Sequence, residues 1–353
     1  MHISDLRKTA LAALGAVALA GATLLAAAPA QAAASPAASA AAKASWQTAI
    51  SHVPQQGTGC YQAAYPSLSW HATACVAAPK IVLVPAQAHD SAHHAGHIGP
   101  QTVGDGSDYS AVVSGLISKA VGTFTDVSSG VSEKGEGVTN SFSLQLNSQF
   151  FSGSPACDAA SDPSSCQAWQ QFVYTYNAVG SGYIFMQYWL IDYNNTCPSG
   201  WTTYSTDCYT NSNATEVSEV TAKDLATVKL TASAASGGND GVSLSIGSGT
   251  ASSVTGKDTK VDLASYWNTT EWGVFGNGGG SAADFGSDNT LEPTTALTST
   301  SSAAPSCVSE GFTGETNNLK LAATAALGTE SSPTIASKQT NGTAGTASCA
   351  TAS

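Results

Sequence analysis

The sequence has no histidine after His97 and no arginine after Arg7. The long C-terminal part of the chain therefore cannot build a Ser-His-Asp or Cys-His catalytic arrangement or a His-Glu-x-x-His zinc site. Without arginine it also lacks the planar group that clamps phosphate through two parallel hydrogen bonds. Any chemistry in this part must come from carboxylates, amides, hydroxyls or backbone groups.

Charge is sparse as well. Charged residues make up 10% of the chain, and 24 acidic against 12 basic residues give a formal net charge of -12. Because an anionic protein is repelled by phosphate backbones, we expect no nucleic-acid partner and no anionic membrane partner. Few charges also mean little self-repulsion when the medium turns acidic, so the composition suits an acidic exterior.

The one long apolar run lies at the N-terminus. Arg7 and Lys8 precede an apolar stretch over 9–28, and Ala30-Gln31-Ala32 offers a small-residue cleavage site. This is the pattern of a secretory signal peptide. We expect residues 1–32 to be removed and the rest to be secreted, since no later segment is long and apolar enough to span a membrane.

Eight cysteines suit an oxidising exterior. Their spacing matches no zinc motif, so we expect disulfides, no metal and no cofactor. The sequence leaves the connectivity open, but pairing of nearest neighbours would close four local loops: Cys60/Cys75, Cys157/Cys166, Cys197/Cys208 and Cys307/Cys349.

Residues 33–101 differ in amino-acid composition from the rest of the chain. Residues 33 to about 45 are rich in Ala, Ser and Pro, which predicts disorder. The part that follows holds one cysteine pair and is interpreted as a pro-segment or a small subdomain. It ends in a polar stretch that contains His89, His93, His94 and His97. Four close histidines can bind zinc, but no carboxylate-bearing strand or helix frames them, which favours a solvated tether.

In residues 102–353, short strand-like runs are separated by Gly, Ser, Asn and Asp. This pattern predicts an all-β antiparallel sandwich or jelly roll. At its centre, two aromatic runs in 169–193 flank a Gly-containing turn and predict a hairpin. Period two places Gln171 with Val173 on one face of the first strand, and Gln187 with Trp189 on one face of the second. Further strands are expected within 140–151, 226–234, 241–246, 254–263, 271–275, 282–285 and 291–297.

Glu271 is the carboxylate of most interest in this domain. It lies in Asn268-Thr-Thr-Glu271-Trp272, ahead of a glycine turn. A carboxylate walled by rings has a raised pKa and can act as a general base in a mildly acidic medium. The alternative is an ordinary exposed glutamate on a strand.

The run from Leu225-Ala-Thr-Val-Lys-Leu to Thr-Glu271-Trp272, followed by Ala283-Asp-Phe-Gly286, resembles the eqolisin family of glutamic peptidases, which has Asn-Ala-Glu-Trp and Ala-Asp-Phe-Gly segments in this order. The resemblance covers about 103–297. It implies a concanavalin A-like double-sheet fold with a catalytic Glu and Gln on the concave sheet. A second likeness, to secreted actinobacterial proteins that share the Gly314–Leu319 segment, carries no function.

Under the eqolisin resemblance the catalytic glutamate falls on Glu271 and the glutamine on Gln171. Gln170 is the alternative, because a slip of one residue swaps the faces of a strand. Glu271 would activate water, and the Gln171 amide would donate a hydrogen bond to the oxyanion. Gln187 falls on an acidic cleft position of the family.

The chain also departs from the family pattern. Its segment Ser143-Leu-Gln145-Leu-Asn147-Ser148 stands where the family has Trp-Val-Gly-Ile-Asp-Gly, so a cleft tryptophan and an aspartate are missing.

The sequence thus predicts a secreted, acid-active glutamic endopeptidase, a monomer that takes a polypeptide substrate and is shielded by a pro-segment over 33–101. Substrate-binding side chains are expected at Gln187, Trp189, Gln145 and Trp272. Two alternatives stay open. The domain is either a binding module for an extracellular glycan, with Trp189 and Trp272 stacking on sugars, or a structural surface protein.

Overall fold

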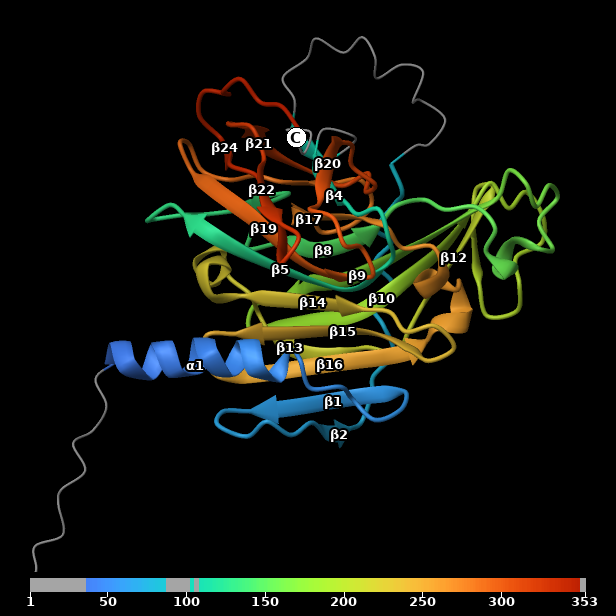
Figure 1. Ribbon diagram of the computed structural model, residues 1–353, viewed down its shortest axis with the longest axis horizontal. Helices are drawn as coiled ribbons and strands as arrows, with labels where there is room; N and C mark the ends of the chain where they lie inside the picture. Colours follow the sequence, from blue (N-terminus) through green and yellow to red (C-terminus); the bar gives the residue numbers. More distant parts are fainter. Residues whose placement is uncertain (1–35, 87–101, 105–107, 350–353) are drawn as a thin grey trace, which may run out of the picture.

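The computed structural model describes residues 36–86, 102–104 and 108–349, and over these residues two large β-sheets lie face to face (Figure 1). The predicted all-β sandwich is confirmed. All strand pairs are antiparallel in the described part except β18 with β21. No helix among these residues is long and apolar enough to cross a membrane.

The 13-stranded sheet runs in the order β18 (Ala282–Ala283), β21 (Thr316–Leu321), β24 (Gln339–Thr340), β19 (Thr290–Ser299), β5 (Ile117–Val127), β14 (Lys229–Ser233), β15 (Asn239–Ile246), β16 (Thr250–Lys257), β1 (Gly59–Ala64) and β2 (His71–Thr73), with β3 (Thr102–Gly104), β22 (Ala326–Thr329) and β23 (Ser332–Ala336) beside this path.

The nine-stranded sheet runs in the order β11 (Thr202–Tyr204), β12 (Asp207–Asn211), β10 (Ser181–Ile191), β9 (Gln167–Ala178), β8 (Phe142–Ser148), β17 (Thr269–Gly276), β4 (Tyr109–Val112) and β20 (Ser306–Ser309), with β13 (Thr215–Ser218) on β10. A separate ribbon pairs β6 (Lys134–Gly135) with β7 (Val138–Thr139).

The predicted central hairpin is β9 and β10. Its turn is Val179-Gly180, shorter than the five-residue turn expected, because both strands continue further than their aromatic runs. Gly180 has φ +87°, a conformation that glycine adopts without strain. The hairpin's inward face carries Phe172 and Tyr174, which are fully buried in the core between the two sheets.

Large rings fill that core. The ring of Phe172 stacks on that of Trp267 at a centroid distance of 5.6 Å, and Phe142 lies 6.3 Å from Tyr174. Burying each such side chain stabilises the fold by roughly 1.5–3 kcal/mol. The apolar residues at every second position of β8 and β9 therefore hold the sheets together, and Gln145, Asn147 and Gln171 lie on the opposite face.

The expected disorder over 33 to about 45 is wrong where the structure describes it, because α1 spans Pro36–Ile50. Alanine is the strongest helix former and proline is favoured in the first helical turn, so the composition suits a helix. Its last turns carry Trp46 and Ile50, which pack against Ala63 and Ala251 of the 13-stranded sheet.

The segment after α1 belongs to the large sheet and is not a separate subdomain. Strand β1 pairs with β16 over its whole length, and β1 and β2 form the end of the 13-stranded sheet in Figure 1. The predicted signal peptide and all four histidines of the polar stretch lie outside the described residues.

All eight cysteines form disulfides, as expected, and the connectivity that the sequence left open is that of nearest neighbours: Cys60–Cys75, Cys157–Cys166, Cys197–Cys208 and Cys307–Cys349. Such a framework is compatible with an oxidising, extracellular compartment.

Candidate active site

Four polar side chains stand in one row across the nine-stranded sheet. Glu271 on β17 is directly opposite Asn147 on β8, which is opposite Gln171 on β9, which is opposite Gln187 on β10. Cross-strand partners point to the same face of a sheet. The predicted pair of Glu271 and Gln171 therefore shares a face, two strands or about 10 Å apart, with Asn147 between them.

Glu271 is completely buried. Its Oε2 accepts hydrogen bonds from Asn147 Nδ2 at 2.9 Å and from the backbone N–H groups of Phe312 at 3.0 Å and Thr313 at 3.2 Å. The amide nearest to Glu271 is thus that of Asn147. Gln171 lies one strand further along the row.

A second carboxyl group, that of Asp108, is hydrogen-bonded to Glu271. Its Oδ2 also accepts from the Gly104 backbone N–H at 2.6 Å. Burial raises the pKa of Asp108 well above its usual value, and the Glu271 charge raises it further. Burial also raises the pKa of Glu271, although the hydrogen bond from Asp108 opposes this shift. Two buried carboxyl groups in contact cannot both ionise, so they share one proton, with neutral Asp108 as the donor.

Sequence reasoning missed Asp108. It ends the segment Gly104-Asp-Gly-Ser-Asp108, whose composition is that of a surface turn. Strand β4 follows directly after this segment, and its pairing with β17 brings the Asp108 carboxyl group to Glu271. No local motif signals a contact between residues so distant in sequence.

The amides beside Glu271 are linked to one another. Gln145 Oε1 accepts from Asn147 Nδ2 at 3.1 Å and from Gln171 Nε2 at 3.0 Å, and Gln145 Nε2 donates to Ser143 Oγ at 2.9 Å. Gln145 was predicted to contact substrate, and in this arrangement it orients the two amides on either side of it. Gln171 keeps a second N–H, because a carboxamide nitrogen carries two hydrogens, whereas Asn147 donates one N–H to Gln145 and the other to Glu271.

The chain's own segment 81–86 crosses this face in extended form at the Gln187 end of the row. Gln187 Nε2 donates to the Ile81 backbone oxygen at 3.0 Å, and Gln187 Oε1 accepts from the Leu83 N–H at 2.9 Å. The Leu83 side chain is fully buried in a cluster with Val173, Phe185 and Ala214.

The other edge of the same segment is also bound. Gly279 N–H donates to Val82 O at 2.7 Å, Gly314 N–H donates to Val84 O at 2.8 Å, and Ala86 N–H donates to Phe312 O at 2.9 Å. Glu315 Oε1 accepts from the Val84 N–H at 2.9 Å. Burial raises the pKa of Glu315 to about 7.

The two predicted tryptophans have different environments. Trp189 lies on the face of the row, where its Nε1 donates to Gln187 Oε1 at 3.1 Å and its ring clusters with Trp169 and Phe312. Trp272 does not reach this face. It packs into the core between the sheets, with Nε1 donating to Thr123 O at 2.9 Å.

Gln170, the alternative to Gln171, also faces the core. It is completely buried, and its Nε2 donates to Met186 Sδ at 3.8 Å. Gln171 is therefore the glutamine on the side of Glu271.

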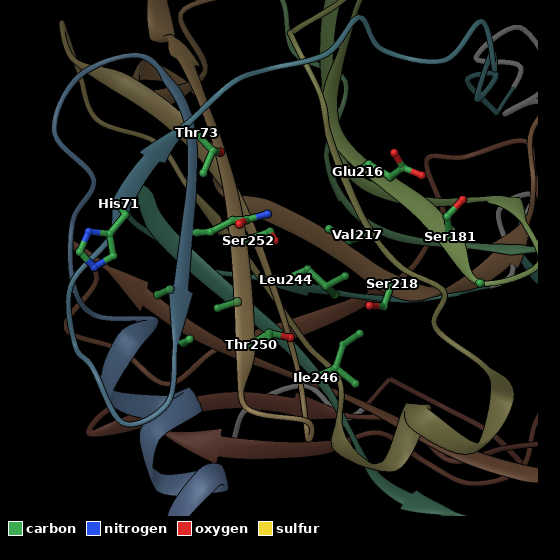
Figure 2. A pocket seen from close by; sticks show the side chains of 15 residues that line it. His71, Thr73, Ser181, Glu216, Val217, Ser218, Leu244, Ile246, Thr250 and Ser252 are labelled. Atoms are coloured by element: carbon green, nitrogen blue, oxygen red, sulfur yellow. The ribbon is translucent and has the colours of Figure 1, made fainter.

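An open cavity of about 690 Å³ lies elsewhere, where β1, β2 and β16 approach β13 (Figure 2). His71 and Glu216 project from opposite sides of it in Figure 2, and both are exposed. Its remaining lining is mostly small apolar and hydroxyl side chains, so it brings no acid and base together.

Comparison with protein-family models, with curated proteins and with solved structures finds no match for this chain. A function can therefore be proposed only from the residues themselves.

Proposed function

We propose that this chain is a secreted, acid-active endopeptidase of the glutamic peptidase type, in a form whose groove is filled by its own N-terminal segment. The observation that carries the proposal is the row of one glutamate and three amides on a single sheet face, with an extended peptide seated on it. The resemblance of the Glu271 region to eqolisins supports the same assignment.

In an emptied groove the Glu271 carboxylate is the general base. It takes a proton from water as the water oxygen bonds to the peptide carbonyl carbon, and the carbonyl π electrons move to the oxygen. The second N–H of the Gln171 amide stabilises that oxyanion, an effect worth several kcal/mol in a preorganised site. The C–N bond then breaks, and the proton passes from Glu271 to the leaving nitrogen.

Asp108 limits the rise in the pKa of Glu271 that burial causes. A hydrogen bond donated by neutral Asp108 favours the ionised form of Glu271. The pair thus holds one negative charge in an apolar place, as two carboxyl groups in contact do in aspartic peptidases.

The groove is blocked in the state described. The backbone of segment 81–86 is hydrogen-bonded to the Gln187 amide, and the N–H groups of Phe312 and Thr313 donate hydrogen bonds to the Glu271 carboxylate. Segment 81–86 can leave the groove while the rest of 33–101 stays attached. Strand β1 is paired with β16, and the Cys60–Cys75 disulfide ties the chain before segment 81–86 to β1. We therefore narrow the shielding role to segment 81–86.

No observation favours the glycan-binding alternative. The rings of Trp169 and Trp189 are completely buried, and Trp272 is in the core, so none of the three presents a face on which a sugar could stack.

The test is the rate of cleavage of a denatured protein by secreted material, measured over about pH 3–7 because the raised pKa of Glu271 sets where its basic form is present. Glu271→Gln should abolish cleavage, while the control Glu216→Gln, at an exposed glutamate far from the row, should leave it intact. Undiminished cleavage by the Glu271→Gln protein would remove Glu271 from the mechanism.

A further inference from the structure

We propose that the groove selects extended polypeptides that carry a large aliphatic side chain, which enters the pocket now filled by Leu83, on the N-terminal side of the bond to be cut. This inference rests on the proposed function and adds to it the class of substrate and the direction in which the substrate lies.

The backbone contacts of segment 81–86 do not depend on its side chains. Gln187 binds Ile81 O and Leu83 N–H, so it pairs with residues i and i+2 as a neighbouring β-strand would. On the opposite edge, backbone groups of Gly279, Gly314 and Phe312 bind the segment as well. Any extended peptide can make these bonds, which is how strand addition provides affinity without sequence preference.

Two glycines let the segment lie this close. A Cβ at Gly314 would come within 2.9 Å of the Val84 side chain, and one at Gly278 within 2.5 Å of the Ile81 side chain. Real Cβ atoms do not approach so closely. The groove walls are therefore shaped to the width of an extended chain.

Selectivity comes from the one side chain of the segment that is completely enclosed. Leu83 has 0% exposure, whereas Ile81, Val82, Val84 and Pro85 are all partly exposed. Its cluster with Val173, Phe185 and Ala214 has no charged member. A charged residue at this position would be buried without a partner, which is costly.

The direction follows from the two ends of the segment. Its Ile81 end is bound by Gln187, three strands from Glu271 in the row. Its Ala86 end is bound by Phe312, whose own N–H is bound to Glu271. In a substrate that lies in the same direction, the residue in the Leu83 pocket is therefore on the N-terminal side of the bond next to the Glu271 carboxylate.

The experiment uses the full-length chain. Leu83→Asp should expel the segment, and a fluorescent peptide with the sequence of residues 80–86 should then bind, as measured by polarisation. A matched peptide with Asp at the Leu83 position should bind at least about tenfold more weakly. The wild-type chain, with its groove filled, should bind neither peptide in the same concentration range.

Ala214→Leu in the Leu83→Asp background should fill the pocket and remove the preference for the leucine peptide. Equal binding of both peptides by the folded Leu83→Asp protein, or binding of neither, would overturn the inference. If Leu83→Asp does not fold, Leu83→Ala takes its place with the same two outcomes. Because polarisation detects binding without cleavage, an inactive protein that still prefers the leucine peptide would contradict the proposed function alone.

Discussion

Gln187 and Leu83 are 104 positions apart in sequence, yet the side-chain oxygen of Gln187 accepts the backbone N–H of Leu83 at 2.9 Å. The same glutamine amide donates to Ile81 O. A side chain on the central hairpin thus binds the backbone of segment 81–86 as the edge of a neighbouring strand would. In the proposed function, a bound peptide substrate makes the same contact.

Truncating Leu83 should destabilise the chain and loosen its segment. Leu83→Ala removes a fully buried side chain, so the free energy of unfolding in urea should fall by about 2–5 kcal/mol. The same change at the exposed Leu68 should cost less than about 0.5 kcal/mol. Equal effects at the two positions would show that Leu83 is not packed in the groove.

Glu315 should make the fold more stable in acid. Its pKa in the folded chain is raised to about 7, above the value of an unfolded glutamate, so the folded state binds the proton more tightly. The stabilisation is fully present below the unfolded value and is lost as pH rises through about 7, for a total of about 3 kcal/mol.

Glu315→Gln keeps acceptors and donors for Val84, Gly280 and Thr313 but cannot titrate. Denaturant unfolding between about pH 4 and 8 should therefore show a flatter stability curve for this variant than for the wild type. A curve of unchanged slope would show that Glu315 is not a source of the pH dependence.

Asp108 should set the acid limit of activity. Asp108→Ala removes the donor that lowers the pKa of Glu271, so the pKa of Glu271 rises and the acid limb of the pH–rate profile moves to higher pH. Asp108→Asn retains an N–H donor and should restore most of the shift. A lower rate at all pH values with no movement of the limb, in both variants, would point to a purely structural role for Asp108.

The longest disulfide loop should contribute most to stability. The Cys307–Cys349 bridge spans 42 positions and the Cys157–Cys166 bridge spans nine. Loop-closure entropy predicts losses of about 4 and about 2.5 kcal/mol when each pair is replaced by serine. Chemical denaturation of the two double variants measures the order, and a larger loss for the shorter loop would contradict it.

Much of the fold could be predicted because β patterns are local. Alternation placed Gln171 and Val173 on one face and Phe172 on the other, and the even number of cysteines predicted disulfides while leaving their connectivity open. The helix at Pro36–Ile50 was missed because its Ala-rich sequence reads equally well as a disordered leader, and its apolar contacts, through Trp46 and Ile50, come only near its end.

The row of the site could not be predicted from the residues alone. Alternation gives the face that Gln171 takes on its own strand, but which amide contacts Glu271 depends on strand adjacency and register, which a single sequence does not reveal. Asp108 and segment 81–86 reach the site through tertiary pairing alone. Trp272 was expected in the groove because it adjoins Glu271, and that same adjacency puts it on the opposite face.

The most direct test compares initial rates of denatured-protein cleavage over about pH 3–7 for the wild type, Leu83→Asp and Leu83→Asp/Glu271→Gln, after circular dichroism has shown that all three fold. If segment 81–86 blocks a groove that Glu271 serves, Leu83→Asp should cleave at least about tenfold faster than the wild type, and the double variant should not cleave. Equal rates for Leu83→Asp and the wild type, or full activity in the double variant, would contradict the account.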